Sequence, residues 1–143
     1  MVFKRPNPRL SVNLTPVANI EQVRTAKLLG VVLCDSLLFD EFVHAVLKTC
    51  SQRMYLMKLL RDQGLPSKEL HCLFHALVDS KIRYAMPAWR GFFSVSAHLV
   101  RQINGLLKRA HRYGFTLDVI SVEDIAESAD SKLFKSITHS NVM

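Results

Sequence analysis

Three side chains that commonly bind metal ions lie within about one helical turn of each other, at His71, Cys72 and His75. Histidines four residues apart share one face of a helix, and imidazole with thiolate suits Zn²⁺. A metal ion would still need a carboxylate or a further histidine from elsewhere, and the sequence lacks the glutamate of a metalloprotease helix. The pattern is more typical of histidines on the flank of a helix, so we predict no metal site.

The cysteines show no sign of redox or metal chemistry. Cys34, Cys50 and Cys72 are an odd number at wide spacings, without a Cys-x-x-Cys pair. This pattern favours neither a disulfide framework nor a thiolate metal site. We expect buried thiols that act as small apolar side chains.

Basic side chains are the strongest chemical signal in the chain. The 143 residues carry a net charge of +7, and residues 94–114 hold four Lys or Arg and no acid. At 100° per residue, Arg101, Lys108 and Arg112 fall within about 40° of arc on one helix face, with Arg109 nearby. Such a face can bind the phosphates of a nucleic-acid backbone without reading bases. The alternative is a solvated face with no partner, which would show no salt-dependent binding.

A short strand and a long helix form the predicted centre of the fold. Residues 28–33 are an apolar run of strand length, interrupted by Gly30, and we expect Leu29 and Val31 to face the helix that follows. That helix covers residues 39–60, because apolar residues recur there at steps of three and four: Phe39, Val43, Val46, Cys50, Met54 and Met57. Two upstream segments are predicted to be short strands or extended arms that pair with the run: Leu10, Val12 and Leu14, then Ala18, Ile20 and Val23.

Two further long helices are predicted downstream. Gly64 ends the first helix, and Pro66 begins a second, antiparallel neighbour that ends near Tyr84. Its expected core stripe is Leu70, Leu73, Phe74, Leu77, Val78 and Ile82. Ser94 or Ser96 caps the third helix, which runs to about residue 113, before Gly114, with an inner face of Leu99, Ile103, Leu106 and Ala110. The single tryptophan, Trp89, is expected to cap the helix pair.

The last 29 residues, 115–143, reverse the sign of the charge. Ser121 with Asp124 predicts one short capped helix, and Leu133, Phe134 and Ile137 predict another. The whole pattern predicts an α+β fold, mostly α, in which a short N-terminal β-hairpin or small sheet precedes a bundle of three longer helices and one or two short C-terminal helices.

We expect a single domain over residues 1–143, made of a strand region (1–35), a helical bundle (36–114) and an acidic helical tail (115–143). No apolar run reaches the ~18 residues that cross a bilayer, and the basic start is not followed by the apolar region of a signal peptide. These features predict a nuclear or cytoplasmic protein without a membrane partner.

Several segments resemble, in order and spacing, one family. They are AKLLGV (26–31), SLLFDEFVHAVL (36–47), CSQRMYLMKLLRDQGLPSKELHCLFHAL (50–77), SKIRYAMPAW (80–89) and INGLLKRAHRYGF (103–115). This order resembles the region downstream of the polymerase palm in non-LTR (LINE-type) retrotransposon reverse transcriptases, over about residues 13–115. The resemblance implies a primer grip, a hairpin that holds the primer end, at Lys27, Leu29 and Gly30. It also implies thumb-like helices that contain Arg53, Tyr55, Lys58, Tyr84 and Trp89.

The chain departs from that family at the catalytic centre. An RNA-directed DNA polymerase holds two Mg²⁺ ions on an Asp-Asp pair and a further aspartate. This sequence has no Asp-Asp dipeptide, and the residues before Ala26 are too few for fingers and palm. We therefore expect a non-catalytic fragment without catalytic residues, cofactor or metal.

The predicted partner is the backbone of an RNA–DNA or DNA duplex. The expected contacts are Lys27, Gly30, Arg53, Lys58, Arg101, Lys108, Arg109 and Arg112. Two alternatives remain open: a helical protein-interaction module, with a partner or a second copy covering the strand edge at 28–33, and a functionless retrotransposon-derived remnant. An independent enzyme would need a clustered site that the sequence does not show.

Overall fold

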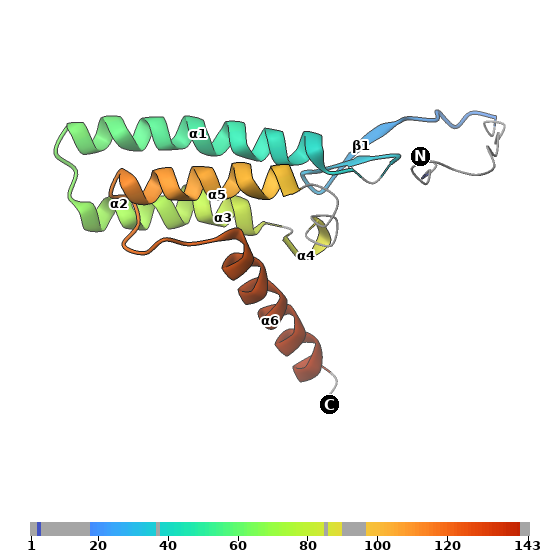
Figure 1. Cartoon of the computed structure of the whole chain (residues 1–143). Helices are drawn as coiled ribbons and strands as arrows, with labels where there is room; N and C mark the ends of the chain where they lie inside the picture. Colours follow the sequence, from blue (N-terminus) through green and yellow to red (C-terminus); the bar gives the residue numbers. More distant parts are fainter. Residues whose placement is uncertain (1–2, 4–17, 37, 85, 90–96, 141–143) are drawn as a thin grey trace.

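The structure is a computed structural model that describes residues 3, 18–36, 38–84, 86–89 and 97–140, with the side chains of 88, 89, 139 and 140 excepted. A β-hairpin leads into long helices that lie side by side, and a C-terminal helix projects away from them (Figure 1). The predicted α+β, mostly α fold is confirmed. The predicted strands around Leu10, Val12 and Leu14, by contrast, lie outside the described residues.

The apolar run at residues 28–33 contains the turn of a β-hairpin. Strand β1 (Thr25–Leu28) pairs antiparallel with β2 (Val31–Cys34), with Leu28 opposite Val31 and Thr25 opposite Cys34. Leu29 and Gly30 form the two-residue loop with φ of 49° and 83°, the left-handed combination of a tight type I′ hairpin turn. The predicted N-terminal β-hairpin is therefore present.

Two details of the strand prediction are wrong. Leu29 is 81% exposed, because it occupies the tip of the turn, whereas Val31 is 8% exposed and joins the core. The second half of the run, in β2, pairs with β1 at residues 25–28, and residues 18–23 form no strand.

Helix α1 (Asp40–Asp62) follows the predicted pattern closely. All six residues of the predicted stripe are buried: Phe39, Val43, Val46, Cys50, Met54 and Met57. Asp40 and Glu41 lie in the first turn, where negative charge complements the helix dipole. The helix ends at Gly64, with φ of 94°, and the amide of Leu65 donates to the carbonyl of Leu60.

The second long helix consists of α2 (Ser67–Phe74), the π segment η1 (His75–Asp79) and α3 (Ser80–Arg83). It packs against α1 and runs back along it, which confirms the antiparallel prediction (Figure 1). In the π segment, the amide of Ser80 donates to the carbonyl of His75, five residues back. This wider turn shifts the helical phase, so Leu77 is exposed although we expected it in the core, and Val78 is fully buried.

Helix α4 (Met86–Trp89) is a single turn, and the predicted position of the Trp89 side chain lies outside the described part. Helix α5 (Ala97–Arg112) packs against α1 and buries its predicted inner face of Leu99, Ile103, Leu106 and Ala110. It ends before Gly114, which has φ of 76°. The predicted caps, Ser94 and Ser96, lie outside the described residues.

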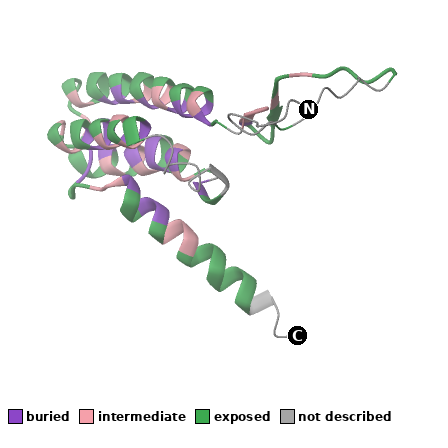
Figure 2. Ribbon diagram, turned by 45° about the vertical axis from the view of Figure 1, so that its right-hand side comes forward, coloured by how far each residue is buried: buried purple, intermediate pink, exposed green. Residues whose placement is uncertain are grey.

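The two short helices expected in the tail form one helix, α6 (Val122–Ser140). Its predicted cap is present, since the amide of Asp124 donates to Ser121 Oγ at 3.1 Å and Ser121 Oγ donates to Asp124 Oδ2 at 2.6 Å. The first turns are buried at Val122, Ile125 and Ala126, whereas residues 131–138 are exposed (Figure 2). Packing of its first half therefore stabilises one continuous helix where the sequence predicted two short ones.

Candidate nucleic-acid interface

The solvent face of α5 is basic, as its sequence predicts. Arg101, Lys108 and Arg112 are exposed and lie opposite the buried residues of the helix. Within the described part of the chain, no ion pair engages these three side chains. The guanidinium carbon of Arg112 lies 5.7 Å from the ring centroid of Tyr113, which orients that side chain near the end of the helix.

A second basic feature, which we call the α1–α5 groove, lies between the two helices. It consists of adjoining hollows that share Ser51 and Arg109. From α1 it is lined by His44, Leu47, Lys48, Ser51, Met54, Tyr55 and Lys58, and from α5 and the residue after it by Gln102, Gly105, Arg109 and Tyr113. No aspartate or glutamate is among these lining residues. A phosphate in the groove would therefore meet cations without meeting a carboxylate.

The groove and the solvent face of α5 adjoin. Arg109 lies about 80° around the helix axis from Arg101, so it belongs to the edge of the basic face and to the groove at once. Lys48 and Lys58 extend the positive surface onto α1. The structure thus brings together the predicted residues Lys58, Arg101, Lys108, Arg109 and Arg112.

Arg61 joins the two helices at one end of this surface. Its Nη1 donates to the carbonyl oxygen of Tyr113 at 3.0 Å, and its Nε and Nη2 donate to the neighbouring Asp62 at 3.3 and 3.0 Å. This contact joins the last turn of α1 to the end of α5. It therefore links the two helices near Lys58 and Arg109.

Lys27 and Gly30, also predicted contacts, lie on the hairpin. Lys27 is exposed in β1, opposite Val32. The hydroxyl of Tyr84 donates to the carbonyl of Leu29 at 2.5 Å, and a side chain added at Gly30 would begin 3.8 Å from the Tyr84 ring. The hairpin tip is therefore held against the end of α3, so residues that the family resemblance assigns to the primer grip and the thumb contact each other.

Arg53 takes a different position from the other predicted cations. It is half-buried, and its Nη1 donates to the carbonyl of Leu77 in the π segment. It therefore joins α1 to η1 and does not line the groove. Tyr55, implied by the resemblance, is 62% exposed at the groove rim.

Several polar residues of the groove were not predicted from the sequence: His44, Lys48, Ser51, Gln102 and Tyr113. One signal for them was available, because Ser51, Tyr55 and Lys58 recur at steps of four and three on one face of α1. Arg109 and Tyr113 are likewise four residues apart. No local pattern, however, indicates which two faces oppose each other across the groove.

The histidines of the His71, Cys72 and His75 pattern have other partners. His75 Nδ1 lies 3.1 Å from Asp79 Oδ2, and Asp79 also accepts hydrogen bonds from Arg83 Nε at 2.8 and 2.9 Å. His71 Nδ1 lies 3.4 Å from the carbonyl of Phe115. Among the residues that the structure describes, no group of three or more His, Cys, Asp or Glu is placed to hold a metal ion.

The expectation that all cysteines are buried holds only for Cys50. All three are free, but Cys34 is half-buried and Cys72 is exposed. Burial raises the pKa of the Cys50 thiol from 9.0 to about 11, although Arg53 and Lys81 oppose the shift. Cys50 therefore stays protonated and acts as a core side chain.

No protein-family model, curated protein or solved structure matches this chain. No helix in the described ranges is both long and apolar enough to cross a membrane.

Proposed function

We propose that the chain binds the sugar–phosphate backbone of an RNA–DNA or DNA duplex through the α1–α5 groove and the solvent face of α5. The observation that carries the proposal is the basic surface shared by two packed helices, on which Lys58 and Arg109 line one hollow without a carboxylate. Arg101, Lys108 and Arg112 continue it on α5. Exposed cations on packed helices suit phosphate contacts that position a duplex and read no bases.

The resemblance to non-LTR retrotransposon reverse transcriptases supports the same function. A thumb holds the primer–template duplex through its backbone, and the contact of Tyr84 with the hairpin tip is consistent with a primer grip resting on a thumb. The chain would do this as a non-catalytic fragment, since it has no Asp-Asp pair for two metal ions. Because such duplexes occur in the nucleus and the cytoplasm, we propose one of these compartments for the protein. The purified chain should extend no primed template with Mg²⁺ or Mn²⁺.

Salt dependence of binding tests the proposal. Fluorescence anisotropy with an RNA–DNA duplex should show log K falling linearly with log salt between about 50 and 200 mM. If each cation contacts one phosphate, changing Arg101, Lys108 and Arg112 together to Gln should reduce the slope by about 2.7, at ~0.9 per contact. The reduction should be equal for duplexes of unrelated sequence.

A matched control separates the basic surface from net charge. Lys68, Lys132 and Lys135 are exposed on α2 and α6, away from the lining of the groove. Changing these three to Gln alters the net charge by the same amount and should leave the slope nearly unchanged. Equal slopes for the two triple variants, both folded by circular dichroism, would refute a duplex path over α5.

A protein-interaction module is the second candidate. Apolar side chains are exposed at the hairpin tip, at Leu28 and Leu29, and on the outer part of α6, at Leu133, Phe134 and Ile137. Exposed apolar surface and short strand edges are typical of contact with another chain. Concentration-dependent self-association that Phe134→Ser abolishes, together with absence of duplex binding, would favour this function.

A further inference from the structure

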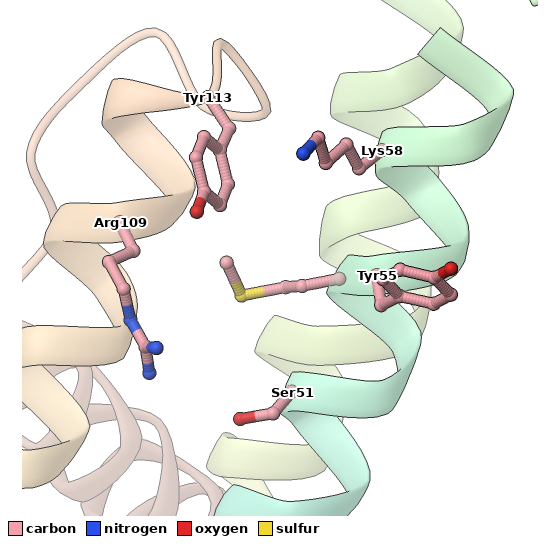
Figure 3. Close-up of a pocket in the computed structure, with 6 residues that line it drawn as sticks. Ser51, Tyr55, Lys58, Arg109 and Tyr113 are labelled. Atoms are coloured by element: carbon pink, nitrogen blue, oxygen red, sulfur yellow. The ribbon is translucent and has the colours of Figure 1, made fainter. Parts of the chain in front are cut away.

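One hollow of the α1–α5 groove has the chemistry of a small anion site. It has a volume of about 200 Å³ and is lined by Ser51, Met54, Tyr55, Lys58, Arg109 and Tyr113. In Figure 3 the amino group of Lys58 extends from α1 towards Tyr113, and the hydroxyl of Ser51 points towards the guanidinium of Arg109. The Tyr113 hydroxyl points into the space between the helices. Polar groups from both helices therefore line the same hollow.

These polar groups are hydrogen-bond donors without a hydrogen-bond partner among the residues that the structure describes. A lysine ammonium and an arginine guanidinium can only donate, and the hydroxyls of Ser51 and Tyr113 can donate. Within the described part of the chain, no side-chain hydrogen bond or ion pair engages any of the four. Met54, 5% exposed, supplies apolar surface at the same hollow. The hollow thus offers donors to a ligand rich in acceptors.

We propose that this hollow binds the terminal phosphate of a nucleic-acid strand, a phosphomonoester at the strand end. A terminal phosphate carries about −1.5 to −2 charge and three acceptor oxygens, whereas an internal phosphodiester carries a single charge. Lys58 as a point charge and Arg109 as a fork of donors together match the more highly charged group. This inference rests on the proposed function, because the strand end arrives there from the duplex path along α5.

The size of the hollow also favours a phosphate group over a larger ligand. A volume of about 200 Å³ is below the ~300–1,000 Å³ of sites that enclose a whole drug-sized molecule. A phosphate group fits, and the nucleoside that carries it would remain in the open groove. Tyr55 stands at that rim, 62% exposed, with its ring directed away from α5.

End-labelled duplexes test the assignment. Two blunt duplexes of one sequence, with 5′-phosphate or 5′-hydroxyl ends, are compared by anisotropy at constant salt. The phosphorylated duplex should bind about tenfold more tightly or better, the gain expected when a charged group acquires hydrogen bonds. In the double variant with Lys58→Gln and Arg109→Gln, the two duplexes should bind alike. Arg109→Gln alone should lose part of the preference.

A second double variant provides the matched control. Arg101→Gln with Arg112→Gln removes two cations from the solvent face of α5, outside the hollow. Both duplexes should bind it more weakly, and the preference for the phosphorylated end should persist. Circular dichroism confirms that each variant is folded.

The outcomes separate this inference from the proposed function. Equal affinity of wild type for both duplexes, with steep salt dependence retained, would overturn the strand-end site and leave duplex binding intact. A preference that persists without Lys58 and Arg109 would overturn it as well. Inorganic phosphate that shifts the NMR signals of Lys58 and Arg109, without binding of either duplex, would refute both proposals and assign the hollow to free phosphate.

Discussion

Replacing Val31 by alanine should destabilise the hairpin, and replacing Leu29 by alanine should not. Val31 is 8% exposed and packs with the core, whereas Leu29, two residues earlier, is 81% exposed at the tip of the turn. Both changes leave an L-residue with a Cβ, so the strain of the positive φ at Leu29 is the same before and after. The pair therefore compares mainly the burial of the two side chains.

The magnitude follows from the carbon atoms removed. Val31→Ala deletes the equivalent of two methylene groups, at about 0.8 kcal/mol each, and any residual cavity adds to the resulting ~1.6 kcal/mol. A value between about 1.5 and 2.5 kcal/mol is expected. Leu29→Ala removes carbon atoms that are already in water and should change the free energy of unfolding by less than about 0.5 kcal/mol.

Urea denaturation followed by circular dichroism, with amide hydrogen exchange, measures both effects. The amide of Asp35, which donates to the carbonyl of Arg24 beside the strands, reports opening of the hairpin. Its exchange should become more than about tenfold faster in Val31→Ala, because about 1.4 kcal/mol already corresponds to a factor of ten. If Leu29→Ala accelerates exchange as much as Val31→Ala does, the burial assigned to the two residues is wrong.

Three further predictions concern the helices. Cys50 should resist a thiol reagent at about pH 8 until denaturant unfolds the chain, because burial raises its pKa to about 11; labelling in native conditions would contradict this. Gly105→Ala should raise the free energy of unfolding by about 0.5–1 kcal/mol, since open space surrounds the added Cβ within a helix, whereas Gly114→Ala, at φ of 76°, should lower it by about 1–2 kcal/mol; urea midpoints that shift in the same direction would refute the contrast. Hydrogen bonds from Ser121 lower the pKa of Asp124 from its ordinary 3.8, so the cap should stabilise α6 above that pH and lose its effect as the pH falls through the folded pKa. Ser121→Ala should return the NMR-measured pKa of Asp124 towards 3.8, and an unchanged value would count against the cap.

Helices were predictable from the sequence where local signals agreed. The steps of three and four from Phe39 to Met57 and the left-handed stop at Gly64 require only nearby residues, and the structure has both. The hairpin was harder to predict, because a leucine with positive φ is not a usual turn residue and the run reads equally well as one strand. The single helix α6 depends on packing of its first turns, which periodicity alone does not report.

The candidate site was likewise predictable from the sequence only in part. Arg101, Lys108 and Arg112 share a face because the 3.6-residue period fixes it, and the structure places all three in solvent. The hollow lined by Lys58 and Arg109, which are 51 residues apart in sequence, depends on how α1 packs against α5. Arg53 has the same charge as Lys58 and lies five residues before it, yet it contacts a carbonyl on another helix.

The π segment explains the spacing of the buried residues in the second helix. Leu70, Phe74, Val78 and Ile82 are buried at steps of four, and in a regular α-helix these steps would drift by about 120° in total. The π segment at His75–Asp79 compensates for most of that drift, because its wide turn contains one residue more than an α-helical turn. With one residue of the segment deleted, the buried positions would fall at steps of four, three and four, the spacing of an ordinary amphipathic helix. The π segment thus accommodates one extra residue in the middle of a core helix, whereas proteins usually accommodate changes in chain length in loops.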